Sequence, residues 1–194
     1  KVQSDFHAMP ARPEKHFITV RDGHFQLDGK RWRAHGINYM PSSGIGTEDG
    51  PYFENWLGKR SYDPEVIQRD LDHIKSLGFN AVSIFVYHHA IKDQNLLDLL
   101  RRLDRLGIRA NLSLRPGSPR HDYPWHLIRE IIEFNRLADN DTLFAYDLDW
   151  EPTFGTREER ATWDQPWHAW ITERYGSLEA AEKDWGVAVP RNQE

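Results

Sequence analysis

The sequence predicts an α/β fold in which short apolar strands alternate with amphipathic helices. Two observations support this. Strand and helix patterns alternate four times along the chain. Two helix ends are also near-copies, because residues 75–80 (KSLGFN) and 105–109 (RLGIR) both run through Leu-Gly directly into a strand. Such alternation is typical of βα units around a parallel sheet.

The chain opens with features of a β-hairpin. Short alternating runs surround two Asp-Gly pairs, at residues 22–23 and 28–29, which predicts a hairpin over residues 17–27. Residues 30–39 are predicted as one strand that enters a glycine-rich loop at 40–50. Residues 1–16 mix prolines and charges without period, so they are predicted to form a flexible arm.

The first predicted helix has clear boundaries. Asp63 suits the N-cap, Pro64 the first helical position and Gly78 the end of the helix. Apolar residues between them follow the helical period. The later strands are predicted at 79–87, 108–114 and 143–148, and the later helices at 96–106, 125–137, 157–163, 166–175 and 177–184.

Composition excludes several classes of protein. The 194 residues carry a net charge of −5 and no basic run, which argues against a nucleic-acid partner. No apolar run is long enough to cross a membrane. The absence of cysteine excludes disulfides, zinc–thiolate sites and a cysteine nucleophile. Eight Trp and seven Tyr supply aromatic surface suited to stacking on ligands.

Two parallel architectures fit the alternation. A doubly wound nucleotide-binding fold should show G-x-G-x-x-G after its first strand, but Gly44-Ile45-Gly46 is followed by Asp49 and no helix. The alternative is a (β/α)8 TIM barrel, which needs about 250 residues. We therefore expect residues 17–194 to supply the N-terminal half, about four βα units. Open strand edges would then need cover, from a missing C-terminal half-barrel or a second copy.

In a parallel barrel the active site lies at the carboxyl ends of the strands. The candidate substrate-binding and catalytic residues are those that follow the four predicted strands. They are Asn38 and Tyr39, then His88 and His89, then Arg115, then Asp149, Trp150 and Glu151. His88 and His89 suit either sugar hydroxyls or a polar loop, and Arg115 suits an ion pair with Glu151 or Asp149. We expect no metal site, because no known ligand motif contains the His pair.

The end of the fourth strand is the most informative segment. Asp147, Asp149 and Glu151 are two residues apart, so they share one face of the strand. Burying three carboxylates against apolar helices would be costly, so we expect that face to point into the barrel. Close like charges raise at least one pKa, which suits a general acid. Alternatively, Asp147 and Asp149 are structural, each paired with an arginine or a backbone N–H.

Several segments together resemble one family. Residues 25–39 (FQLDGKRWRAHGINY), 70–80 (DLDHIKSLGFN) and 144–152 (FAYDLDWEP) resemble clan A glycoside hydrolases of the family 5 type. Residues 173–186 (ERYGSLEAAEKDWG) resemble the β-galactosidase-like members of family 42. The resemblance covers roughly residues 17–186.

The resemblance implies a retaining glycosidase that acts on β-linked oligosaccharides or polysaccharides without a cofactor or metal. Glu151 matches the general acid/base, and the nucleophilic Glu would come from a seventh strand outside this chain. Two departures, Trp150 where the family has Asn and Ser83 near a usual Arg, favour an alternative: a carbohydrate-binding or degenerate barrel. A metal-dependent hydrolase using the three carboxylates is weaker, because metal sites usually recruit His.

Aromatic residues outside the strand ends have two interpretations. Tyr52 and Trp56, in the loop after the first strand, are expected to be exposed and available for stacking on a sugar. Trp167 and Trp170 are three residues apart, so they share a helix face. Together with Trp163 they suit either internal packing or a sugar subsite.

Overall fold

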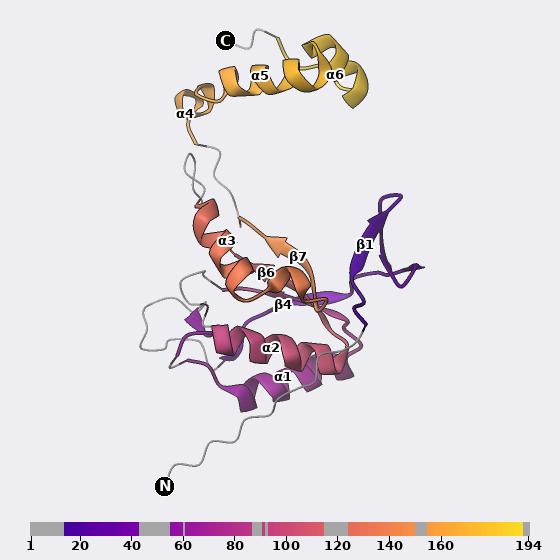
Figure 1. The fold of residues 1–194 in the computed structure, drawn as a ribbon, viewed down its shortest axis with the longest axis vertical. Coiled ribbons are helices and arrows are strands. Elements are labelled where there is room, and N and C mark those ends of the chain that lie inside the picture. The colour runs from indigo at the N-terminus through magenta and orange to yellow at the C-terminus, as the bar shows by residue number, and fades with distance from the viewer. Residues whose placement is uncertain are drawn as a thin grey trace. The chain divides into compact units, whose positions relative to one another are not determined.

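The computed structural model describes residues 14–42, 55–59, 61–86, 91, 93–114, 124–149 and 155–191. Contacts divide the chain into two compact units, residues 1–151 and 152–194 (Figure 1). Within the described residues, no helix has the length and apolar character needed to span a bilayer.

The first unit begins with a small antiparallel sheet, which confirms the predicted hairpin. Asp22 and Gly23 both have positive φ, at 50° and 70°, as a tight two-residue hairpin turn requires. The backbone N–H of His16, just before this sheet, donates to Asp141 Oδ2 at 2.8 Å. The three strands are β1 (Ile18–Arg21), β2 (His24–Leu27) and β3 (Lys30–Arg31).

The predicted single strand over residues 30–39 is wrong, because its middle leaves the β ladder. The side chain of Asn80 takes the place of a neighbouring strand there. Its Oδ1 accepts from the His35 N–H at 2.8 Å, and its Nδ2 donates to the Arg33 carbonyl at 2.9 Å. The segment therefore splits into β3 and β4, which belong to different sheets.

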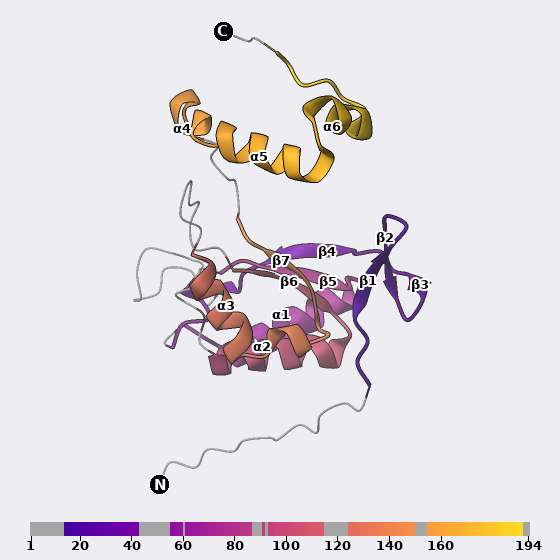
Figure 2. The ribbon, with the colours of Figure 1, turned by 45° about the horizontal axis from the view of Figure 1, so that its top comes forward.

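The main sheet of the unit is parallel, as the alternation predicts. Its strands run in the order β4-β5-β6-β7, so each βα unit adds one neighbouring strand (Figure 2). A register shift between Ala110 and Asn111 is the irregularity in the described ladder. The four strands are β4 (Gly36–Tyr39), β5 (Ala81–Ile84), β6 (Arg109–Ser113) and β7 (Leu143–Asp147).

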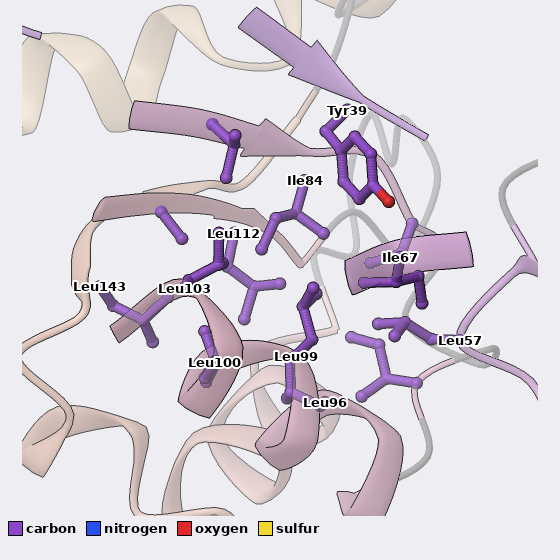
Figure 3. Close-up of a cluster of buried hydrophobic side chains, with 14 of the residues drawn as sticks. Tyr39, Leu57, Ile67, Ile84, Leu96, Leu99, Leu100, Leu103, Leu112 and Leu143 are labelled. Carbon is purple, nitrogen blue, oxygen red and sulfur yellow. The ribbon is translucent and has the colours of Figure 1, made fainter. Parts of the chain in front are cut away.

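Helices cover one face of this sheet. Figure 3 shows the core between them, where Ile84 and Leu112 from the strands meet Leu99 and Leu103 from α2. Ile128 of α3 joins the same cluster. The elements are α1 (Pro64–Ser76), α2 (Asp93–Leu106), α3 (Trp125–Phe134) and the short 3-10 turn η4 (Leu137–Asp139).

Two helix boundaries test the capping predictions. Asp63 caps α1, because its Oδ1 accepts from the backbone N–H of Glu65 and of Val66, both at 3.0 Å. The predicted helix 125–137 ends early, since Arg136 takes a left-handed conformation at φ 50° and breaks the helical run.

The second unit consists of three short helices, α4 (Arg157–Ala161), α5 (Asp164–Tyr175) and α6 (Leu178–Trp185). Pro166 was predicted to begin the middle helix, but it lies inside the first turn, where a missing N–H is tolerated. Within the described part of this unit, Ile171 and Ala181 are the buried hydrophobic residues.

Candidate functional site

The uncovered face of the parallel sheet carries small and polar residues. The strand register places Asn38, Ser83, Asn111 and Ala145 side by side at one level. Strand residues alternate between faces, and their neighbours Val82 and Leu112 belong to the helix-covered core. This level therefore faces away from the helices, as the interior of a barrel would.

Only some of the polar groups at this level have a hydrogen-bond partner among the described residues. Asn111 Nδ2 donates to Ser83 Oγ at 3.1 Å, while Asn111 Oδ1 is buried without a hydrogen-bond partner among the described residues. Asn38 is exposed. Together with Gly36, Ala81 and Phe144, these three residues line a hollow of about 440 Å³.

Gly36 is required where β4 approaches β5 most closely. A Cβ at this position would lie 2.6 Å from the Ala81 carbonyl oxygen, which is backbone and cannot rotate away. We expect Gly36→Ala to reduce the free energy of unfolding by about 1–3 kcal/mol through overpacking. Urea denaturation measures this loss. Asn38→Ala, an exposed substitution on the same strand, is the control, and an unchanged midpoint for Gly36→Ala would contradict the close approach.

Strand β7 brings acidic residues to the carboxyl end of the sheet. Asp147 is in register with Ser113, and both face away from the side of the sheet on which the core residue Leu112 lies. The Asp147 carbonyl accepts from the Leu114 N–H at 2.8 Å. Asp147 and Asp149 are half-buried, whereas Tyr146 and Leu148 are exposed. This alternation matches the predicted two-residue pattern of the strand end.

The described residues include three of the predicted site positions, Asn38, Tyr39 and Asp149. Asn38 and Asp149 belong to the sheet and its carboxyl edge as expected. The other predicted positions, His88, His89, Arg115, Trp150 and Glu151, lie outside the described residues, as does Tyr52.

Tyr39 does not lie in the open part of the sheet, which corrects the prediction that it contacts a sugar. Its side chain is 4% exposed, and its hydroxyl donates to Asp70 Oδ2 on α1 at 3.4 Å. Burial and the Asp70 carboxylate raise the pKa of Tyr39, so its hydroxyl stays protonated. The cause is strand alternation: Asn38 takes the uncovered face, so Tyr39 must take the helix-covered face.

Trp56 was expected to be exposed for stacking, and this expectation is wrong. The side chain is fully buried, and its Nε1 donates to the Phe85 carbonyl at 2.7 Å. Its ring packs edge-on against Tyr39, with centroids 5.7 Å apart. Residues 55–58 therefore belong to the core.

Sequence reasoning did not include Asn111 and Ser113 among the site residues. Their signal is a polar side chain at every second position of an otherwise apolar strand, residues 109–113. Among the described residues, no three His, Asp or Glu side chains lie close enough together to hold a metal ion.

Comparison with known proteins gives little further information. No family model and no curated protein matches the sequence. One solved structure, an endo-1,4-β-mannanase from Rhizomucor miehei, is similar with a TM-score of 0.47 and 13% identity over 81% of this chain. The chain spans 57% of the length of that structure. A likeness at this level indicates no shared activity, so the functional case depends on the residues of this chain.

Proposed function

We propose that the chain forms part of a glycoside hydrolase in which Glu151 is the general acid/base. The observation that carries the proposal is the position of Asp147. It ends the fourth parallel strand on the uncovered face of the sheet, four residues before Glu151. Active sites of parallel barrels lie at this edge. The resemblance of residues 144–152 to clan A glycosidases supports the same role.

In the proposed reaction, Glu151 protonates the glycosidic oxygen as the bond to the anomeric carbon breaks. A second carboxylate, from outside these 194 residues, attacks that carbon and forms a glycosyl ester. Glu151 then removes a proton from the water that releases the sugar. Retaining enzymes hold the two carboxyl groups about 5–5.5 Å apart. Asp147 and Asp149 precede Glu151 by four and two residues.

The proposed substrate is a β-linked oligosaccharide or polysaccharide. Asn38 is exposed on the open face and Asp149 follows β7, so both suit contacts with sugar hydroxyls. His88, His89, Arg115 and Trp150 are proposed to line the same edge from the neighbouring loops. The free edges of β4 and β7 in the described sheet, together with its open face, support the proposed half-barrel of residues 17–194. A C-terminal half-barrel or a second copy would close it.

A second candidate is a carbohydrate-binding barrel without activity. The observation that favours it is Ser83, which stands near the usual arginine of the family and bonds Asn111. This leaves a neutral pair where a cation would hold the substrate or a catalytic carboxylate.

A panel of nitrophenyl glycosides distinguishes the two candidates, with the full-length gene product as the enzyme. We expect release of nitrophenol from at least one β-glycoside, and the sugar product should appear first as the β-anomer by proton NMR. Calorimetric binding of oligosaccharides without any nitrophenol release would favour the inactive barrel. First appearance of the α-anomer would exclude the retaining mechanism.

A further inference from the structure

Three indole rings form an ordered stack in the second unit. We call Trp167, Trp170 and Trp185 the indole cluster. The rings of Trp167 and Trp170 have centroids 5.1 Å apart and planes 15° from parallel. The rings of Trp167 and Trp185 are 6.0 Å apart and 23° from parallel. The three rings therefore run as one nearly parallel series along α5 and onto α6.

Neighbouring side chains fix this series. Trp185 Nε1 donates to the Tyr175 hydroxyl at 3.2 Å, and the Tyr175 ring contacts both Trp170 and Trp185 edge-on. The Arg174 guanidinium carbon lies 5.7 Å from the Trp170 ring centroid. Because the rings are already ordered, a ligand that stacks on them loses little binding free energy to side-chain ordering.

Two members of the cluster, the middle ring of Trp167 and the end ring of Trp170, are partly open to solvent. Trp167 is 49% and Trp170 is 42% exposed. Their Nε1 groups make no hydrogen bond to any residue that the structure describes, so two donors stand beside the exposed rings. The buried hydrophobic residues of the described unit are Ile171 and Ala181, and neither ring is among them. Exposed aromatic patches with polar rims mark interaction sites.

The net charge of the second unit disfavours one class of ligand. Residues 155–191 carry seven acidic and five basic side chains, so a polyanion such as nucleic acid would be repelled. Asp164 lies three residues before Trp167 on α5 and Glu173 lies three residues after Trp170, so these exposed acidic residues neighbour the two rings. His168, next to Trp167 in sequence, is exposed as well. Ordered rings with hydrogen-bonding groups at their edges fit a neutral molecule with flat apolar faces and hydroxyl edges, which describes a pyranose.

We propose that the indole cluster is a binding site for the sugar rings of a neutral glycan. The site is independent of Glu151 and requires no turnover. The solvent-exposed parts of the Trp167 and Trp170 rings supply the surface on which sugar rings stack, and Trp185 with Tyr175 holds these two rings in place.

Calorimetric titration of the full chain with mannohexaose and cellohexaose tests the site. We expect binding of at least one hexasaccharide and no binding of dextran sulfate. Trp167→Ala and Trp170→Ala should each weaken binding at least tenfold, while Trp170→Tyr should retain most of it. Trp125→Ala removes a Trp of the other unit that is 58% exposed and should bind as the unmodified chain does.

Three outcomes would overturn the site: no binding of either hexasaccharide, an equal loss in Trp125→Ala, or tighter binding of dextran sulfate. Loss of the helical circular dichroism signal in both Trp170→Ala and Trp170→Tyr would also overturn it, because the rings would then be structural. Binding of a hexasaccharide without any nitrophenol release from the glycoside panel would refute the proposed enzyme and leave the indole cluster intact.

Discussion

Glu151→Gln is expected to lower kcat/KM for alkyl β-glycosides by about 10²–10⁴-fold, the usual contribution of a positioned general acid. An alkoxide is a poor leaving group, so bond cleavage needs the proton that a glutamine amide cannot supply. Dinitrophenolate leaves without protonation, so kcat/KM for dinitrophenyl glycosides should fall far less. Steady-state kinetics on both substrates with the full-length gene product measure the contrast.

Glu130→Gln is the matched control for this substitution. Glu130 is an exposed residue of α3, so Glu130→Gln removes the same charge at a position away from the carboxyl edge of the sheet. Its kinetics should equal those of the unmodified enzyme. If Glu151→Gln slows both substrates by the same factor, Glu151 does not donate the proton to the leaving group.

Trp56→Ala is expected to reduce the free energy of unfolding by about 3–5 kcal/mol, the range for large aromatic deletions in cores. Its side chain is fully buried, and its removal leaves a cavity beside Tyr39 and deletes the hydrogen bond from Trp56 Nε1 to the Phe85 carbonyl. Both effects destabilise the same region, at the carboxyl ends of β4 and β5. Urea denaturation monitored by far-UV circular dichroism gives the free energy.

Trp125→Ala provides the comparison, since that side chain is mostly exposed at the start of α3. Exposed substitutions usually change stability by about 0.5 kcal/mol or less. Equal losses in the two variants would show that Trp56 is not a core residue. Trp56→Phe keeps part of the buried volume but loses the hydrogen bond to Phe85, so it should fall between them.

Local signals in the sequence predict the elements of the fold well. The Asp22-Gly23 turn and the Asp63 cap depend on neighbouring residues alone, and both lie where the sequence predicts them. The interrupted strand over 30–39 could not be predicted, because its cause is the side chain of Asn80, which is distant in sequence. Contacts of that kind exist only after the chain folds.

The candidate site is predictable only as a region. Strand ends identify the edge of the sheet, but the two neighbours Asn38 and Tyr39 must face opposite sides. Which one faces the helices depends on the register between strands, and the structure buries Tyr39. The bond between Ser83 and Asn111 likewise joins residues 28 apart and needs that register.

The burial of Trp56 could not be predicted for a related reason. A tryptophan in a long predicted loop has no periodic pattern, so nothing local indicates whether it is buried. The neighbouring Leu57 is fully buried as well, and two large apolar residues in succession were the available sign of a core segment.

The most direct test of the role of Glu151 is the product that Glu151→Ala forms from a dinitrophenyl β-glycoside in sodium azide. Without the general base, water attacks the glycosyl ester slowly, but azide needs no base because it is already an anion. The account predicts a faster rate with azide and a β-glycosyl azide as product. An unchanged rate with free sugar as the only product would contradict it.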